Sequence, residues 1–156
     1  MISASRRRLV VLYVVVAALL HTERTAEAEA TARECIAMTG LDEYIDTMSS
    51  NLPVEKRRRL DLCRALALKP KIIMLDECLA GLNPREMEQG LDLVRLLNKN
   101  GISIVFIEHV MKAVCSLCHR VVVLNQGELL AEGTPEAVMN DDKVIKAYLG
   151  GSFKRA

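Results

Sequence analysis

Two short apolar runs, each followed by a stretch with helical spacing, stand out in the middle of the chain. Residues 71–75 and 102–107 are almost continuously apolar and contain β-branched side chains, which is typical of strands buried on both faces of a parallel sheet. A third run at 120–124 predicts another strand. Residues 125–128, Asn-Gln-Gly-Glu, predict a hairpin turn that leads into a fourth strand at 129–131.

Helices are predicted around and between these strands, because apolar residues recur there every three or four positions. Gly40 is placed to end the first helix. The Ser-Ser-Asn sequence at 49–51 is expected to cap the next helix, with Pro53 in its first turn and Pro70 just beyond its end. The predicted helices cover 23–38, a short stretch at 41–48, the segment between Pro53 and Pro70, 85–99, 110–117 and one or two amphipathic stretches from Thr134 onward.

The order strand, helix, strand, helix, strand predicts an α/β fold with a parallel sheet, right-handed crossovers and flanking helices. In such sheets the chemistry collects at the carboxyl ends of the strands. Two predicted strands end in ionisable residues. Asp76 and Glu77 follow the first strand, and Glu108 and His109 follow the second.

These side chains have a clear use in phosphoryl transfer. An Asp can hold the Mg²⁺ that bridges the β- and γ-phosphates of a nucleotide, and the adjacent Glu can polarise an attacking water. A His beside the neighbouring strand can donate to the γ-phosphate or to that water. Either pair alone is explained more simply as the cap of a strand or a helix, but both pairs, separated by one crossover, favour a nucleotide site.

Taken in order, the residues at these positions resemble the ATPase subunits of ABC transporters. The strand that ends in Asp76-Glu77 resembles a Walker B strand, Asn83 lies in a sequence similar to the D-loop, and Glu108-His109 resembles the switch-histidine loop. The resemblance runs from about residue 34 to residue 151, and the ordered set of motifs is far more specific than any one of them. The matching segments are Ile72–Glu77, Ala80–Pro84, Ile107–His109, Asn125–Glu128 and Glu132–Pro135.

This resemblance implies a partial P-loop NTPase fold of the ABC-cassette type, with a remnant of the helical subdomain of the cassette. It implies ATP and Mg²⁺ as ligands. In the family pattern, Asp76 serves the metal, Glu77 and His109 are catalytic, and Asn83 belongs to the nucleotide-binding part.

A narrower resemblance is to the branched-chain amino acid importer ATPases, because Leu52-Pro53 stands at the signature position and residues 141–150 match the tail of that branch. It implies ATP hydrolysis coupled to amino-acid import. The implied partners are transmembrane permease subunits and a second ABC ATPase subunit in a dimer. The implied location is cytoplasmic, peripheral on the inner face of the cell membrane.

Departures from the family pattern bear on activity. The phosphate-cradling loop, G-x-x-x-x-G-K followed by Ser or Thr, does not occur in the 156 residues, and the glutamine loop is not recognisable. The signature reads Leu-Pro-Val-Glu-Lys at 52–56, so Glu55 stands where a Gly lets the backbone approach phosphate, and its charge is expected to repel phosphate oxygens. Cys78 replaces the usual proline after the catalytic Glu.

We therefore expect little or no ATP turnover by the lone chain. Two hypotheses follow from the sequence. The chain is a truncated or eroded ATP-binding subunit of an ABC transporter, or it is a non-catalytic interaction module that dimerises with or docks on a full-length ABC ATPase. With the upstream strands of a cassette missing, its sheet is expected to expose an apolar edge and face.

Residues 1–22 form an apolar N-terminal segment of uncertain fold. Their run Leu9–Leu20 follows three arginines and is shorter than the roughly 20 residues that span a bilayer. It reads as a buried or edge element, as the product of a spurious start, or as a targeting segment. The other predicted parts are the helical-subdomain remnant at 23–69, the C-terminal part of the nucleotide-binding core at 70–133 and a helical tail at 134–156.

The composition argues against some kinds of partner and of stabilising cross-link. The aromatic fraction is 3% with no Trp, and 21 Lys and Arg face 20 Asp and Glu, which argues against nucleic acid as a partner. The five cysteines lack the spacing of a disulfide framework and are expected to be reduced. Cys115 and Cys118 form a C-x-x-C pair that is expected to pack in the core rather than to bind metal.

Overall fold

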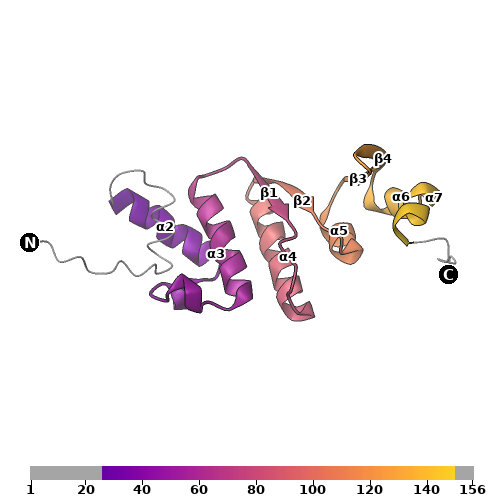
Figure 1. The fold of residues 1–156 in the computed structure, drawn as a ribbon. Coiled ribbons are helices and arrows are strands. Elements are labelled where there is room, and N and C mark those ends of the chain that lie inside the picture. Colours follow the sequence, from indigo (N-terminus) through magenta and orange to yellow (C-terminus); the bar gives the residue numbers. More distant parts are fainter. Residues whose placement is uncertain (1–25, 150–156) are drawn as a thin grey trace, which may run out of the picture. The chain divides into compact units, whose positions relative to one another are not determined.

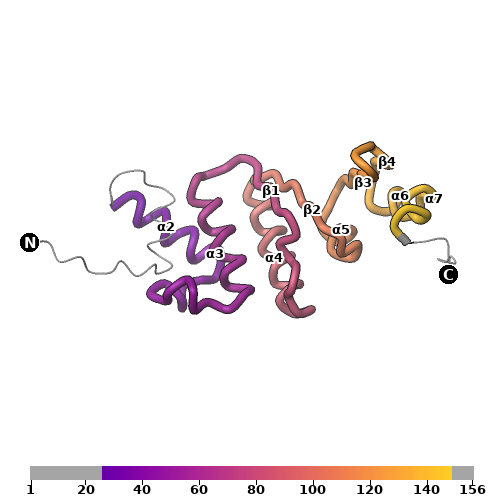
Figure 2. The backbone as a smooth tube through the Cα atoms, viewed as in Figure 1, coloured from indigo at the N-terminus to yellow at the C-terminus, as the bar shows by residue number. Residues whose placement is uncertain are grey.

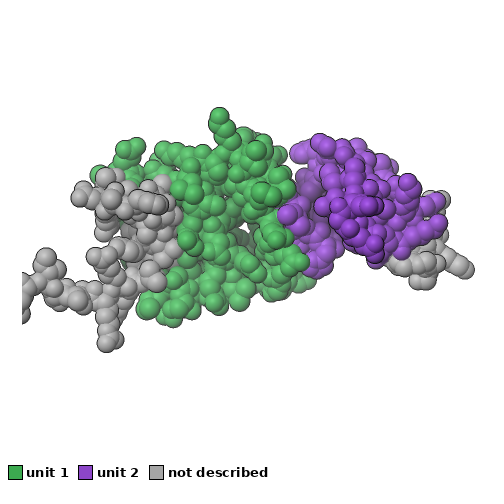
Figure 3. Space-filling model, turned by 45° about the horizontal axis from the view of Figure 1, so that its top comes forward, with its two compact units in different colours: residues 1–105 green, residues 106–156 purple. Residues whose placement is uncertain are grey.

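The computed structural model describes residues 26–149 and divides the chain into two compact units (Figure 3). Unit 1 is Met1–Val105 and unit 2 is Phe106–Ala156. Figure 1 labels the helices and strands, and Figure 2 traces the same backbone from indigo at the N-terminus to yellow at the C-terminus. The predictions made for residues 1–22 lie outside the described residues.

Unit 1 opens with α2 (Ala26–Met38), which ends at the predicted glycine. Gly40 has a φ of +66°, a backbone conformation that glycine adopts at little cost. Its amide donates to the Ala37 carbonyl over 3.1 Å, and the amide of Leu41 donates to the Ile36 carbonyl over 3.0 Å. These two bonds are those of a Schellman motif, and they direct the fully buried Leu41 into the core.

Two 3₁₀ turns, η1 (Asp42–Tyr44) and η2 (Ser49–Asn51), connect α2 to α3 (Val54–Ala67). The turn η1 replaces the short helix predicted at 41–48. The predicted capping of α3 by residues 49–51 is wrong, because Pro53 is the N-cap and no side chain caps the helix. A capping side chain has to flank the first helical residue, and residues 49–51 are instead taken up by η2.

A parallel strand–helix–strand arrangement follows α3, as the sequence predicts, and the boundary of unit 1 falls within its second strand. Strands β1 (Ile72–Asp76) and β2 (Ser103–Ile107) are hydrogen-bonded neighbours, and α4 (Pro84–Lys99) connects them. The amide of Ser103 donates to the Lys71 carbonyl over 2.9 Å. This bond joins the start of one strand to the start of the other, so both run in the same direction.

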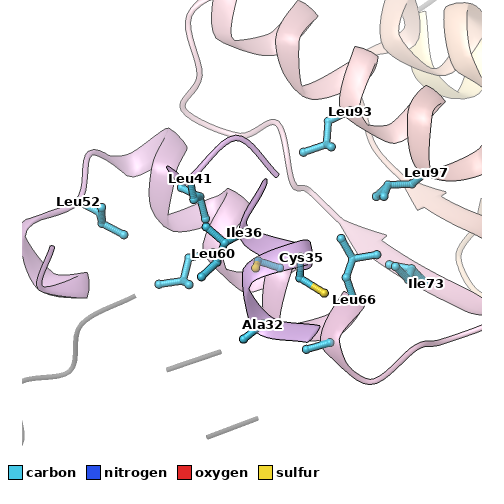
Figure 4. Close-up of a cluster of buried hydrophobic side chains, with 12 residues drawn as sticks. Ala32, Cys35, Ile36, Leu41, Leu52, Leu60, Leu66, Ile73, Leu93 and Leu97 are labelled. Carbon is cyan, nitrogen blue, oxygen red and sulfur yellow. The ribbon is translucent and has the colours of Figure 1, made fainter. Parts of the chain in front are cut away.

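The core of unit 1 gathers side chains from α2, α3, α4 and β1 (Figure 4). Ile73 is the buried side chain of β1, and Leu97 of α4 is fully buried. Such burial of aliphatic groups is the main term that stabilises the unit. The cluster consists of Ala32, Cys35, Ile36, Leu41, Leu52, Leu60, Cys63, Leu66, Ala67, Ile73, Leu93 and Leu97.

The strands are not buried on both faces, which corrects the sequence prediction. Ile73 is 5% exposed, but its neighbours Ile72 and Met74 on the other face are 60% and 69% exposed. Val105 of β2 is exposed as well. Among residues 26–149, helices of unit 1 cover the Ile73 face, and the expected exposed apolar face is present on the other side.

Unit 2 is built on a β-hairpin. It contains α5 (Met111–Leu117), β3 (Val121–Asn125) and β4 (Glu128–Gly133). The two residues between the strands, Gln126 and Gly127, have φ of +51° and +84°, as in the tight turn that the sequence predicts. β3 pairs antiparallel with β4 in a sheet separate from β1–β2, so the prediction of a third strand in the parallel sheet is wrong for the described residues.

Short helical segments follow the hairpin: α6 (Pro135–Met139), α7 (Asp142–Val144) and the π-helical turn η3 (Ile145–Leu149). Thr134 starts α6 as predicted, since its hydroxyl accepts a hydrogen bond from the Ala137 amide over 3.3 Å. Val123, Val138 and Val144 form the small core of unit 2. Among the described residues, no helix is both long and apolar enough to cross a membrane.

Candidate functional site

The predicted site begins where β1 ends. Asp76 is the last residue of the strand and is exposed, and the exposed Glu77 follows with a φ of +43°. A left-handed backbone is uncommon for a residue with a side chain, and such positions concentrate at functional sites. The Glu77 carbonyl accepts from the Ala80 amide over 3.1 Å, which closes a turn directly after the strand. This turn fixes the direction in which the two neighbouring carboxylates leave the sheet.

Asn83 is engaged in the start of α4. Its Oδ1 accepts from the amides of Arg85 and Glu86, each over 3.0 Å. The carboxylate of Glu86 accepts in return from the Asn83 amide, also over 3.0 Å. This reciprocal capping box, with Pro84 in the first helical position, ties the turn after β1 to the helix.

His109 lies in unit 2, two residues beyond the end of β2, and is exposed. It does not cap α5, since the N-cap of that helix is Val110 and no side chain donates or accepts there. The simpler explanation considered from sequence therefore fails for His109. In unit 1, Asp76 and Glu77 follow each other at the end of β1 and Asn83 is the N-cap of α4, whereas His109 belongs to the other unit.

Glu55, in the signature-like segment, is only 7% exposed. Its carboxylate pairs with the Nε of Arg59 and, over 3.1 Å, with the Nζ of Lys56. Arg59 also donates from Nη1 to the carbonyl of Thr39 over 3.1 Å. The carboxylate is thus turned into a charged cluster that links the start of α3 to the end of α2.

Sequence reasoning gave Glu55 only the role of repelling phosphate and missed this cluster. The sequence does contain a sign of this ion pair, since Glu55 and Arg59 are four residues apart on a helix, a spacing at which opposite charges meet. The run of Arg57, Arg58 and Arg59 obscured it, because Arg58 at i+3 and Arg59 at i+4 can both meet Glu55 and the sequence does not say which of them does.

A pocket of about 240 Å³ opens in unit 1 between α3, β1 and α4. Asp76 and Cys78 reach it from the strand end and the turn. The sequence pattern gave no sign of it, because a pocket depends on how three elements pack. Its lining consists of Glu55, Arg58, Arg59, Asp61, Leu62, Ala65, Ile73, Met74, Leu75, Asp76, Cys78, Leu79, Leu82, Glu86, Gly90, Leu93 and Val94.

All five cysteines are free, as predicted. Cys63 is fully buried, and this burial raises the pKa of its thiol to about 12. Cys115 is exposed on α5, so the prediction that the C-x-x-C pair packs in the core is wrong for that residue. The described residues contain no cluster of three or more His, Cys, Asp or Glu that could hold a metal ion by themselves.

The carboxylates at the end of β1 can be compared with what Mg²⁺ bound together with a nucleotide requires. Mg²⁺ is commonly held by one or two carboxylates and completes its shell with phosphate oxygens and water. Asp76 and Glu77 supply neighbouring exposed carboxylates at a strand end, which fits that pattern. The phosphate-cradling loop that would hold the nucleotide does not occur in the 156 residues.

Known proteins resemble the chain in sequence. A family described as "Branched-chain amino acid ATP-binding cassette transporter" matches residues 128–154. LivG of Escherichia coli, a high-affinity branched-chain amino acid transport ATP-binding protein, is 42% identical over 130 residues, which are 81% of this chain and 51% of LivG. BraF of Pseudomonas aeruginosa, described in the same words, is 39% identical over 130 residues, 81% of this chain and 51% of BraF. The chain spans about half the length of the curated relatives it matches.

Solved structures of ATP-binding cassettes share the fold. The ADP conformation of MJ1267, an ATP-binding cassette of an ABC transporter, superposes with a TM-score of 0.82 at 24% identity. The match covers 92% of this chain and 63% of that one. A putative metal-chelate type ABC transporter in an inward-facing conformation gives 0.83 at 18% identity, over 94% of this chain and 60% of that one.

Proposed function

Since the chain carries the C-terminal part of an ABC-transporter ATP-binding cassette, we propose that it works in the ATP-driven import of branched-chain amino acids. The observation that carries this proposal is the 42% identity to LivG over 130 residues, together with the tail match at 128–154. The proposed partners are transmembrane permease subunits and a second ATPase subunit. Such an assembly would place the chain on the cytoplasmic face of the membrane.

In this proposal each site residue has a distinct task. Bound Mg²⁺ neutralises phosphate charge in phosphoryl transfer, and Asp76 is the residue that would hold it. Glu77 orients and polarises the attacking water, and the left-handed backbone at this residue supports a functional constraint. His109 donates to the γ-phosphate. Asn83 keeps the turn that carries Glu77 joined to α4 through its capping box.

A chimeric cassette tests the proposal. The part of E. coli LivG that precedes the matched region would be joined to this chain, and ATP-dependent uptake of labelled leucine would be measured in cells that lack LivG. We expect uptake above that of the Glu77→Gln chimera, which removes the carboxylate and keeps the shape. Uptake that is equal in both chimeras, or absent from a chimera that folds and reaches the membrane, would contradict the proposal.

A non-catalytic role is the second candidate, and the inward pairing of Glu55 favours it. The Glu55 carboxylate is committed to Arg59 and Lys56 in the segment that resembles the signature. An interaction module would copurify with a full-length relative while its Glu77→Gln variant leaves the ATPase rate of the mixture unchanged. A drop in that rate on the Glu77 substitution would exclude this candidate.

A further inference from the structure

Unit 2 carries two cysteines one helical turn apart at the end of α5. The amide of Cys118, the C-cap of the helix, donates to the Val114 carbonyl over 2.9 Å, so the backbone follows the helix up to this residue. Cys118 has a φ of −84°, and the chain leaves the helix only at its ψ of 140°. Because φ sets the direction of the Cβ from the preceding chain, the Cβ of Cys118 lies near its helical position, about 5–6 Å from that of Cys115.

This spacing is close to what a disulfide requires. Residues three apart on a helix have Cα atoms about 5 Å apart, within the range of about 4.4–6.8 Å seen across disulfides. The Cβ atoms have to approach to about 3.5–4.5 Å, which is a movement of about 1–2 Å. Since α5 ends at Leu117, that movement bends the last turn of the helix and leaves its buried part, Ala113 and Val114, in place.

Exposure to solvent distinguishes this pair from the other cysteines. Cys115 is exposed and Cys118 is partly buried beside it. Cys35 and Cys63 are buried in the core of unit 1, where a reagent in solution does not reach them. Cys78 is partly buried, and the nearest cysteine to it in the sequence is the buried Cys63. A dissolved oxidant therefore meets Cys115 first, with Cys118 one turn away to complete the reaction.

We propose that Cys115 and Cys118 are a dithiol site that a small-molecule disulfide of the glutathione type oxidises to an intramolecular disulfide. The Cys115 thiolate attacks one sulfur of the disulfide R–S–S–R, whose S–S bond breaks, and a mixed disulfide forms as RS⁻ leaves. The Cys118 thiolate then attacks the Cys115 sulfur and expels the second RS⁻. The two cysteine protons end on the two RSH, and two electrons pass from the pair to R–S–S–R.

The surroundings of Cys118 favour retention of the disulfide once it has formed. Burial, and after it the negative charge of Cys115, raise the pKa of the Cys118 thiol. A thiol with a raised pKa is a poor leaving group, so a reductant that attacks the exposed Cys115 sulfur expels Cys118 slowly. The proposal goes beyond the proposed transport function and stands without it, because it uses only α5 and its C-cap.

Thiol trapping on the full chain tests the site. The reduced chain, freed of reductant, is equilibrated with oxidised and reduced glutathione at about pH 8, trapped with N-ethylmaleimide and digested with trypsin. Cleavage after Lys112 and Arg120 puts Cys115 and Cys118 in one peptide, residues 113–120, and leaves Cys78 in another. Mass spectrometry should find the 113–120 peptide two hydrogens lighter and without maleimide. We expect this disulfide to be at least about tenfold more abundant than the glutathione adduct of Cys78. A peptide that keeps both maleimides at every glutathione ratio would overturn the proposal.

Serine variants separate the two steps. Cys118→Ser removes the second thiol, so the reaction should stop at a glutathione adduct on Cys115. Cys115→Ser leaves the partly buried thiol, which should react at least about tenfold more slowly. Cys78→Ser is the matched control and should leave the yield of disulfide unchanged. A glutathione adduct that persists on Cys115 of the unsubstituted chain as it does in Cys118→Ser would overturn the proposal, as would a disulfide between two chains in place of the internal one.

The contribution of the fold is measured by repeating the equilibration in urea. Far-UV circular dichroism first confirms that the chain and its variants are folded in buffer. Because α5 already holds the two residues one turn apart, we expect the equilibrium constant for disulfide formation to be at least about fivefold larger in the folded chain than in urea. Equal constants would show that α5 does not preorganise the pair and would overturn the proposal.

Discussion

Arg59 of α3 donates a hydrogen bond from Nη1 to the carbonyl oxygen of Thr39, which follows the last residue of α2, over 3.1 Å. The last carbonyls of a helix have no partner within the helix, so this bond satisfies one of them. A Cβ on Gly40 would lie 3.2 Å from the same Nη1, so the glycine also makes room for the guanidinium. Glu55 completes the arrangement by pairing with the Nε of Arg59.

This cluster makes Glu55 a structural residue. Replacing it by Gly, the residue of the resembling signature, leaves the half-buried Arg59 without its carboxylate and adds a flexible residue to the first turn of α3. We expect Glu55→Gly to lower the free energy of unfolding by about 2–4 kcal/mol in urea melts. The control is Glu88→Gly on α4, where the pair with Arg95 is exposed and about 1 kcal/mol is expected. Equal losses for both variants would contradict a structural role of Glu55.

The capping box at Asn83 gives a second prediction. Asn83→Ala removes two hydrogen bonds from the start of α4 and is expected to cost about 1 kcal/mol, and Asn83→Asp keeps a capping oxygen and should cost less than about 0.5 kcal/mol. Chemical denaturation of both variants measures the difference. If Asn83→Ala is as stable as the unmodified chain, the capping box contributes nothing.

Local sequence signals predicted much of this arrangement. Gly40 ends α2, Thr134-Pro135 starts α6, and the Gln126-Gly127 turn closes the hairpin, because each depends on backbone preferences of a few residues. The positions of Asp76 and Glu77 at the end of a strand followed from the apolar run before them.

Features that depend on distant residues could not be predicted in the same way. The setting of Glu55 depends on Arg59, which also binds the Thr39 carbonyl just beyond α2, and the pocket needs three elements. The exposure of Ile72 and Met74 was misjudged because their apolar run is the same whether one or both faces of a sheet are covered. Asn83 was assigned to nucleotide binding from the family pattern alone, and its hydrogen bonds to the start of α4 appear only in the structure.

Burial of the Cys63 thiol is expected to make the free energy of unfolding fall as the pH becomes alkaline. Burial raises the pKa of its thiol from 9.0 to about 12, so between these values the unfolded chain releases a proton that the folded chain retains. The contribution of Cys63 is full below pH 9 and is lost as the pH rises toward 12, at about 1.4 kcal/mol per pH unit. Urea melts at pH 8 to 11 compare the chain with Cys63→Ala, which should show a shallower decline. Identical declines would mean that Cys63 titrates normally.

The same substitution is expected to affect stability far more on one face of β1 than on the other. Met74→Thr changes a residue that is 69% exposed, so we expect a change of less than about 0.5 kcal/mol in stability and a larger soluble fraction on expression. Ile73→Thr places a hydroxyl in the core at a residue that is 5% exposed and should cost about 2 kcal/mol or more. Greater destabilisation by Met74→Thr than by Ile73→Thr would show that the exposed face is covered in solution.

Nucleotide binding by the lone chain is the most direct test. We propose that Asp76, Glu77 and His109 are the hydrolytic residues of a cassette site, but the loop that would bind the phosphates does not occur in the 156 residues. A fluorescent ATP analogue with Mg²⁺ would be titrated against the folded chain and against Glu77→Gln. We expect no saturation below about 1 mM and no difference between the two proteins, because the phosphate-cradling loop does not occur in the 156 residues. Saturable binding at micromolar concentrations, changed by the Glu77 substitution, would contradict it.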